Sequence, residues 1–295
     1  MAKQIEFSPL IVGAMRLGSW GVNMATDELE KFIDQCLDLG LRDFDHADIY
    51  GHYTEEANFG KVIARRPDLK SKVQITTKCG IRLVTPNRPS YKISSYDSTY
   101  DHIIASAERS LSYLNIGQID LLLIHRPDYL MDPSKIAKAF DDLKSSGKVK
   151  YCGVSNFTTD QFELLNAHTP LVTNQIEASL IHFNPYEDGS ITQCQRYGIQ
   201  PTIWSPLGGG KLFTEPKDEQ VKRIHSSAEV ICERHNCTLD QLMLAWLLKH
   251  PSNMVPVLGT SKISRIKSAL KATEIDLTHE EWYQLLEASR GHKVE

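Results

Sequence analysis

The 295-residue sequence has no long run of hydrophobic residues. Hydrophobic residues make up 41% of it, but no stretch approaches the roughly 18 uninterrupted apolar residues of a membrane-spanning helix. The first six residues include an acid and lack the apolar core of a secretion signal or transit peptide. We therefore expect a chain with no membrane span, whose N-terminus is that of the mature protein.

The sequence also has no excess of basic residues. Lysine and arginine total 33 and aspartate and glutamate 37, which gives a formal net charge of -4, and arginines do not cluster anywhere. A general binder of nucleic acids or anionic membranes would carry a basic excess or a basic stripe. We exclude nucleic acids and membranes as partners on this ground.

Cysteine pairs at metal-binding or redox-motif spacing are missing. The six cysteines are scattered, with no C-x-x-C pair and no histidines grouped at the spacing of metal ligands. This pattern is typical of free, mostly buried thiols in a reducing compartment. We predict no metal site and a cytoplasmic location.

Linkers rich in proline or glycine are missing too, and β-rich segments alternate with amphipathic helical segments along the chain. Predicted helices begin near Thr26 and Pro133 and end at Gly40 and Gly147. Predicted strands occupy residues 10–17, 42–45, 73–78, 119–125, 149–155, 171–177, 201–206 and 254–258. These eight repeats predict an α/β fold with one domain over residues 1–295, a single (β/α)8 TIM barrel. The alternative, a doubly wound open sheet, would have fewer strands.

Two segments interrupt the strand–helix repeat. Residues 80–97 follow the third predicted strand, and residues 207–218 follow the seventh. Each could be a disordered excursion, but in a barrel both would lie at the carboxyl ends of the strands, where loops form active sites. We expect both at the mouth of the barrel.

Four polar side chains stand at or just after the ends of predicted strands. Asp45 ends the second strand and Tyr50 follows five residues later, while Lys78 and His125 end the third and fourth. Each alone is commonly a helix cap, a packing residue, an exposed lysine or a structural histidine. Because the strand ends of a barrel converge on one mouth, the four together predict a proton-transfer site.

The chemistry of the four groups fits proton transfer. An ammonium beside a tyrosine favours the phenolate, so we expect the pKa of Tyr50 to fall below its usual value near 10. A buried lysine needs a carboxylate partner, which Asp45 supplies, and a neutral histidine can orient a carbonyl group. General acid catalysis accelerates reactions about 10²–10⁴-fold, so a cofactor must supply the rest.

Three motifs around these residues resemble those of the aldo-keto reductase family. F-D-H-A-D-I-Y-G at residues 44–51 is similar to the family's F-D-T-A-x-x-Y-G, Lys78 lies in a T-K motif, and H-R-P at residues 125–127 resembles its H-x-P. The resemblance extends over about residues 8–290. It implies a barrel that reduces carbonyls with a nicotinamide cofactor, in which Tyr50 is the acid, Lys78 and Asp45 tune it, and His125 positions the substrate.

The same resemblance implies where the nicotinamide and pyrophosphate bind. G-V-S-N at residues 153–156 and N-Q at 174–175 are similar to the family's carboxamide-binding motifs, and W-S-P-L at 204–207 matches a segment whose aromatic residue stacks on nicotinamide. G-G-G-K at 208–211 is either a flexible turn or a belt whose amides contact the pyrophosphate. No G-x-G-x-x-G follows a strand, which counts against a Rossmann-type site. The residues implied are Ser155, Asn156, Gln175, Trp204, Ser205, Pro206, Leu207, Gly208 and Lys211.

The other end of the cofactor is implied at residues 256–265, where the eighth strand leads into a helix. The N-terminus of a helix favours anions. The resemblance places the 2′-phosphate of NADP(H) at Thr260, Lys262 and Arg265, beside Gly259 and Ser261, and two cations favour NADP(H) over NAD(H). A solvated basic helix start is the alternative. Gly259 stands where the family has lysine, and Ala269 where it often has an asparagine that contacts adenine.

Four residues near the predicted strand ends are candidates to line a substrate pocket with Trp204. They are Trp20, Tyr53, Arg126 and Tyr129, and they suit aromatic or small apolar carbonyl compounds. Ordinary packing is the alternative for each of them.

The sequence thus predicts an NADP(H)-dependent oxidoreductase that reduces aldehyde and ketone carbonyls by direct hydride transfer, as a monomer or small homo-oligomer. One alternative is a nicotinamide-binding regulatory or partner-binding module, because the resembled family includes channel-associated subunits. Such a module needs only the residues that bind the cofactor. The presence of all four residues Asp45, Tyr50, Lys78 and His125 therefore disfavours it. A cofactor-free barrel lyase or isomerase is disfavoured by the predicted cofactor residues.

Overall fold

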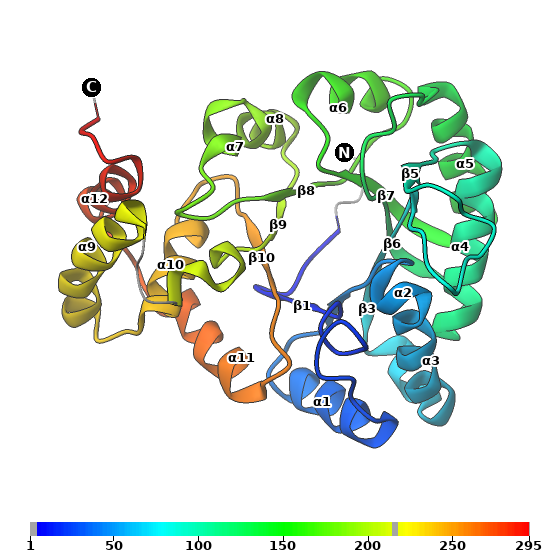
Figure 1. The fold of residues 1–295 in the computed structure, drawn as a ribbon, viewed down its shortest axis with the longest axis horizontal. Helices are drawn as coiled ribbons and strands as arrows, with labels where there is room; N and C mark the ends of the chain where they lie inside the picture. The colour runs from blue at the N-terminus through cyan, green and yellow to red at the C-terminus, as the bar shows by residue number, and fades with distance from the viewer. Residues whose placement is uncertain (1–4, 214–217, 295) are drawn as a thin grey trace.

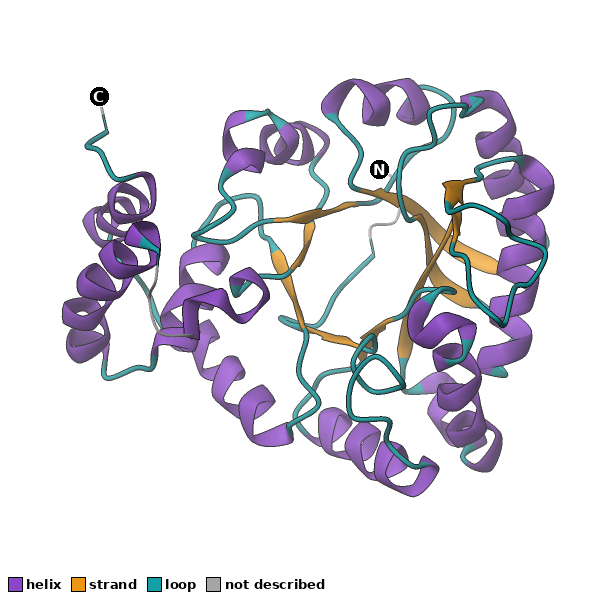
Figure 2. Ribbon diagram, viewed as in Figure 1, coloured by secondary structure: helices purple, strands orange, loops and turns teal. Residues whose placement is uncertain are grey.

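The structure is a computed structural model that describes residues 5–213 and 218–294. Eight parallel strands close into a barrel in the order β1-β10-β9-β8-β7-β6-β3-β2, and helices surround it (Figure 1; Figure 2). The barrel strands are β1 (Ile11–Gly13), β2 (Asp43–Asp45), β3 (Gln74–Cys79), β6 (Ile119–Ile124), β7 (Val149–Ser155), β8 (Asn174–Glu177), β9 (Thr202–Trp204) and β10 (Val255–Leu258). Each overlaps one of the eight predicted segments, so the predicted (β/α)8 barrel is confirmed.

Each barrel strand is followed by helical segments that return the chain to the other end of the barrel. Side chains cap the starts of two of these helices: the Asp132 carboxylate accepts from the first amides of the helix that Pro133 begins, and Thr158 closes a capping box. The α-helices are α1 (Thr26–Asp38), α2 (Tyr50–Tyr53), α3 (Glu55–Arg65), α4 (Tyr100–Leu114), α5 (Pro133–Ser145), α6 (Thr159–Asn166), α7 (Asn184–Glu187), α8 (Ser190–Tyr197), α9 (Glu219–His235), α10 (Leu239–Leu248), α11 (Ile263–Leu270) and α12 (His279–Arg290). The 3-10 helices are η1 (Pro67–Ser71), η2 (Gly208–Phe213) and η3 (Lys271–Glu274).

The strand interiors are buried on both faces, as parallel barrel strands require. In β6, residues 121–124 are fully buried, and their side chains alternate between the helix layer and the barrel interior. Ile5 packs on the inward-facing Leu121 and Leu123, and Phe7 packs beside it, so the first described residues close the floor of the barrel. The opposite end, where the strands terminate, is left as the mouth.

The two predicted loops lie at this mouth, and the first is more ordered than an irregular excursion. A two-stranded antiparallel hairpin, β4 (Ile81–Arg82) and β5 (Ser95–Tyr96), forms within residues 80–97, and Asp97 N donates to Gly80 O at 2.8 Å. The second loop begins with η2, and its residues 214–217 lie outside the described part of the chain.

The last helices build a layer outside the barrel. In Figure 1, α9 and α12 lie side by side on the far side of α10 from the barrel. Trp246 of α10 stacks on Trp282 of α12 with ring centroids 4.8 Å apart, and each indole N–H donates to the other residue's carbonyl, at 3.1 and 3.0 Å. In the described part of the chain, no helix combines the length and apolar character that crossing a bilayer requires.

Candidate active site

The structure brings the four predicted catalytic side chains together at the mouth. Lys78 Nζ donates to Asp45 Oδ2 at 2.6 Å and lies 3.1 Å from the Tyr50 hydroxyl. The His125 ring meets the Tyr50 ring edge-to-face, with centroids 6.1 Å apart. The end of β2, the segment after it and the ends of β3 and β6 thus supply a carboxylate, a phenol, an ammonium and an imidazole to one place.

A strained turn presents Tyr50. The next three residues, Gly51, His52 and Tyr53, have φ values of 58°, 58° and 69°, in the left-handed region that side chains disfavour. Thr54 Oγ1 donates to Gly51 O at 2.6 Å and fixes the turn. The chain changes direction sharply at this turn, directly after Tyr50, and the Tyr50 hydroxyl faces Lys78.

Lys78 is held as a buried cation. Its side chain is 1% exposed, and besides Asp45 and Tyr50 its ammonium donates to the His46 carbonyl at 2.8 Å. Burial alone would lower its pKa, but the nearby Asp45 carboxylate and Tyr50 outweigh burial and raise the pKa above its usual value. The lysine is therefore charged at neutral pH.

The expectation that the pKa of Tyr50 falls below 10 is wrong for this structure. Burial raises the pKa of Tyr50, and although Lys78 lowers it through its charge and hydrogen bond, burial has the larger effect. Tyr50 is therefore a protonated phenol at neutral pH. Lys78 favours the phenolate, but its effect on the pKa is smaller than that of burial.

His125 is neutral for a similar reason. Burial, together with the charges of Lys78 and Arg126, holds the pKa of His125 well below its usual range. Within the described residues its buried Nδ1 has no hydrogen-bond partner. A neutral imidazole beside Tyr50 can donate one N–H to a carbonyl oxygen.

The predicted nicotinamide residues form a network beside the catalytic four. Ser155 Oγ donates to Gln175 O at 2.9 Å, and Asn156 Nδ2 donates to His125 O at 3.1 Å. The Trp204 indole donates to Asn156 Oδ1 at 2.9 Å. The ends of β6, β7, β8 and β9 are thereby joined around one space.

Gln175 also contacts one of the four predicted catalytic residues directly, which the sequence did not indicate. Its Nε2 donates to Asp45 Oδ1 at 2.9 Å, across 130 positions of the chain. Asp45 therefore has one oxygen on Lys78 and the other on Gln175, so its orientation is fixed.

The rest of the predicted nicotinamide segment, residues 205–207, and the predicted pyrophosphate belt, residues 208–211, follow β9. Ser205 has a φ of 50°, Pro206 is buried, Leu207 packs on the core, and Lys211 is exposed. Gly209 and Gly210 have φ values of 64° and 92°, and a Cβ on either would meet nothing within 4 Å. Gly208 has no such room, because a Cβ there would lie 2.2 Å from Ile181 Cδ1.

The predicted phosphate residues gather at the N-terminus of α11. Lys262 is the N-cap residue, and its backbone N–H donates to Thr260 Oγ1 at 3.2 Å. Gly259, Lys262 and Arg265 are exposed, and Thr260 and Ser261 half-buried. Within the described residues neither basic side chain has an acidic partner, whereas Ala269 is buried in the core.

The candidate substrate residues fall into two groups. Trp20 lies 6.1 Å from Tyr50 between ring centroids, and the Arg126 guanidinium lies 5.6 Å from the Trp204 ring, so both border the site. Tyr53 is only 7% exposed, and its hydroxyl bonds Ile81 O at 3.1 Å and Leu83 N at 2.9 Å, so it anchors the β4–β5 loop. Tyr129 is 92% exposed and lies apart from these contacts.

Two buried polar residues near the site were not singled out by sequence. His46 is fully buried with neither ring nitrogen hydrogen-bonded in the described residues, and burial, with Lys78, lowers its pKa to about 3. Glu55 at the start of α3 is 1% exposed, and neither carboxyl oxygen makes a well-formed hydrogen bond to the residues that the structure describes. Burial raises its pKa to about 7, although the Asn58 side chain lowers it in part. The sequence could have drawn attention to His46, because it stands in the F-D-H-A motif where the resembled family has threonine. No feature of the sequence pointed to Glu55.

Across residues 5–213 and 218–294, no group of three or more His, Cys, Asp or Glu side chains is arranged to hold a metal ion.

The chain is similar to known proteins over nearly its whole length. The family model described as "Aldo/keto reductase family" matches residues 9–290. The chain is 43% identical to "Uncharacterized oxidoreductase YcsN" of Bacillus subtilis, covering 100% of this chain and 98% of the relative. It is 37% identical to "6-dehydroglucose reductase" of Agrobacterium fabrum, covering 100% and 98%. A crystal structure of the thermostable aldo-keto reductase Tm1743 with the inhibitor epalrestat superimposes with a TM-score of 0.81 at 26% identity, covering 97% of each chain.

Proposed function

This chain belongs to the aldo/keto reductase family, and on that premise we propose that it reduces aldehydes and ketones to alcohols with NADP(H), with Tyr50 as the general acid. The observation that carries this proposal is the chain of contacts from Asp45 through Lys78 to the Tyr50 hydroxyl, at 2.6 and 3.1 Å. A module that only bound a nicotinamide would not need it.

Each residue of the four has a distinct task in this proposal. NADPH, when bound, supplies the hydride. Tyr50 donates its proton to the carbonyl oxygen as that atom gains negative charge, and Lys78 stabilises the phenolate left behind. Asp45, oriented by Gln175, keeps the ammonium charged and in place. His125 is neutral and offers an N–H to the same oxygen, which orients the carbonyl.

The side chains at the mouth fit a nicotinamide cofactor. Ser155, Asn156 and Gln175 carry the donors and acceptors that a carboxamide needs, and Trp204 offers an aromatic face to the ring. The open space at Gly209 and Gly210 lets the backbone approach a pyrophosphate. The other cofactor residues in the proposal are Ser205, Pro206 and Leu207 of the segment that holds Trp204, and Gly208 and Lys211 of the belt.

The choice of NADP(H) over NAD(H) rests on the start of α11. Lys262 and Arg265 are exposed cations without acidic partners in the described residues, beside Thr260 and Ser261 and the helix amides. Gly259 is exposed with open space around it, so it leaves room for the phosphate but adds no charge.

Tyr50→Phe tests the general acid, because it removes the hydroxyl and keeps the ring. We expect kcat for aldehyde reduction, followed by NADPH absorbance, to fall about 10²–10⁴-fold, with the Kd for NADPH from calorimetry little changed. Tyr113→Phe on α4, which removes a hydroxyl remote from the mouth, is the matched control. Normal turnover by Tyr50→Phe would overturn the assignment.

Calorimetric Kd values for the two cofactors test the phosphate site. We expect NADPH to bind more tightly than NADH by roughly 100-fold, since two charged contacts are each worth about 1.5 kcal/mol. Lys262→Ala and Arg265→Ala should each weaken NADPH and leave NADH unaffected. Near-equal affinities in the parent protein would contradict the proposed roles.

The substrate panel should combine aromatic and small apolar carbonyls with quinones, dicarbonyls and sugar-derived aldehydes. Trp20 at the mouth supports the apolar members. Arg126 supports oxygen-rich members, as does the relative called 6-dehydroglucose reductase. Tight NADPH binding with no turnover across the panel would instead favour the regulatory or partner-binding module.

A further inference from the structure

The C-terminal end of α9 brings two cysteines together. Asn236 adopts a left-handed φ of 48°, Cys237 N donates to Cys232 O at 3.0 Å, and Asn236 N donates to Glu233 O at 3.3 Å. These two bonds define a Schellman motif, in which the side chains at the two ends of the longer bond commonly make a hydrophobic contact. Here both of those side chains are thiols.

The two thiols are close enough for each to shift the pKa of the other. Both are half-buried, whereas the other four cysteines of the chain are buried. Two cysteines can be bridged without backbone movement only when their Cα atoms are within about 7 Å. The 3.0 Å backbone bond from Cys237 N to Cys232 O holds the two Cα atoms within about this distance.

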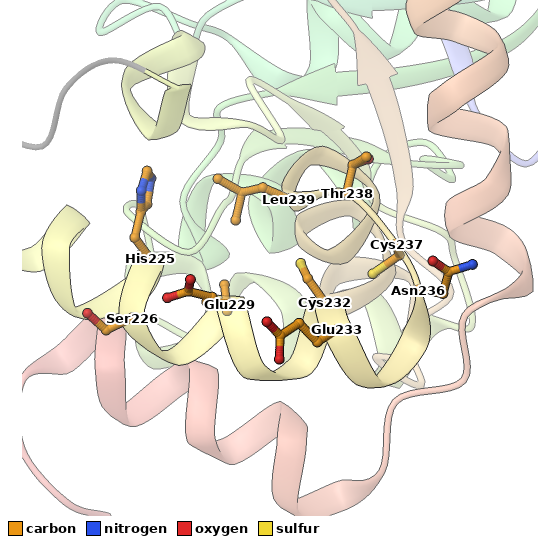
Figure 3. A pocket seen from close by; sticks show the side chains of 10 residues that line it. His225, Ser226, Glu229, Cys232, Glu233, Asn236, Cys237, Thr238 and Leu239 are labelled. Atoms are coloured by element: carbon orange, nitrogen blue, oxygen red, sulfur yellow. The ribbon is translucent and has the colours of Figure 1, made fainter.

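A cavity of about 690 Å³ adjoins the pair, between α9 and the start of α10 (Figure 3). This volume is within the range of small-molecule sites. The cavity includes none of the four catalytic residues. Its lining residues are His225, Ser226, Ala228, Glu229, Cys232, Glu233, Asn236, Cys237, Thr238 and Leu239.

The charge of the cavity is acidic. Glu229 and Glu233 lie on its α9 wall beside Cys232, and within the described residues neither has a basic partner (Figure 3). Asp240 of α10 adds a third negative charge close to both thiols. Of the lining groups only His225 can become cationic, and its Nε2 is bonded to Leu212 O at 2.6 Å. The field therefore favours a neutral or cationic ligand over an anionic one.

We propose that Cys232 and Cys237 form a redox-active dithiol, which closes to a disulfide when a neutral or cationic low-molecular-weight disulfide enters this cavity. Cys237 loses its proton and attacks one sulfur of the incoming disulfide, whose S–S bond breaks and releases one thiol. Cys232 then loses its proton and attacks Cys237 Sγ, which releases the second thiol. The protein gives up two protons and two electrons, and the reagent is reduced to two thiols.

The order of attack follows from the contacts between the sulfurs. Burial, with smaller contributions from Cys237 and Asp240, raises the pKa of Cys232 to about 12. Burial also raises the pKa of Cys237, but Cys232 lowers it in part. Cys237 is therefore the first of the two to become a thiolate, which is the nucleophilic form.

Peptide mapping of the full chain tests closure. Trypsin cuts after Arg234, so a disulfide would link peptide 224–234 to peptide 235–249. After incubation with cystamine and blocking of free thiols, we expect this linked pair, which dithiothreitol should separate. Separate cystamine adducts on Cys232 and Cys237, or two unmodified thiols, would overturn the proposal.

Three variants separate the steps. Cys232→Ser should trap a stable cystamine adduct on Cys237, whereas Cys237→Ser should react at least about 10-fold more slowly, because its remaining thiol has the higher pKa. At low salt, cystamine should react at least about 10-fold faster than the anionic glutathione disulfide. That ratio should fall towards one in Glu229→Gln/Glu233→Gln. Equal rates for the two reagents in the parent protein, or a faster reaction of Cys237→Ser, would refute the proposed site.

Discussion

Replacing Lys78 by methionine should destabilise the protein strongly, whatever its substrate. Lys78 and Asp45 are 1% and 4% exposed, and the substitution leaves the carboxylate buried with Gln175 as its remaining partner among the described contacts. Removing one partner of a buried ion pair costs about 3–5 kcal/mol, because a charge is left without compensation. This is a large share of the 5–15 kcal/mol by which folded proteins are typically stable.

Equilibrium urea unfolding at pH 7, followed by circular dichroism, measures this cost. The matched control is Lys72→Met, which breaks the exposed Lys72–Asp68 pair, 2.7 Å apart, and should cost less than about 1 kcal/mol. The double variant Asp45→Asn/Lys78→Met removes both charges, so it should cost less than the sum of the two single variants. The reasoning is refuted if Lys78→Met is no more costly than the control, or if the costs add.

Two buried glutamates should shape the pH dependence of stability in opposite ways. Burial raises the pKa of Glu55 from 4.5 to about 7, so stability falls as pH rises from 4.5 to 7. Glu55→Gln should therefore be more stable than the parent at pH 8, by up to about 3 kcal/mol, and as stable as the parent near pH 4. Urea unfolding measures both, and free energies of unfolding that change in parallel with pH in the two proteins would contradict this expectation. Burial disfavours ionised Glu281, but Thr278 N, His235 and Arg234 outweigh it and lower its pKa to about 2. The stability that Glu281 adds above pH 4.5 is lost as pH falls towards 2, so Glu281→Gln should flatten this part of an acid-unfolding curve, and an unchanged curve would argue against the Glu281 contacts.

The barrel could be predicted because its strands are locally distinctive. The run of four apolar residues in β6 is buried on both faces, and Pro133 marks where a helix begins. The β4–β5 hairpin could not be predicted in the same way, because each strand has only two residues. It depends on the Tyr53 hydroxyl, which lies about thirty residues earlier in the chain.

The sequence predicted which residues form the candidate site better than it predicted the contacts between them. Strand ends placed Asp45, Lys78 and His125 at one mouth, but the bond from Gln175 to Asp45 spans 130 positions. The pKa of Tyr50 was predicted in the wrong direction, because the effect of Lys78 is visible in the sequence and the depth of burial is not. Tyr53 was grouped with Tyr50 by proximity, yet the intervening turn sends its hydroxyl to the loop backbone.

The stacked Trp246–Trp282 pair has a spectroscopic consequence. The chain has four tryptophans, and the other two, Trp20 and Trp204, stand beside Tyr50 and Asn156 at the mouth. Indole fluorescence therefore comes from two separate places. A molecule bound at the mouth would quench Trp20 and Trp204, whereas loosening of α12 would change the emission of the stacked pair, so single-tryptophan variants could follow ligand binding and the outer layer independently in one protein.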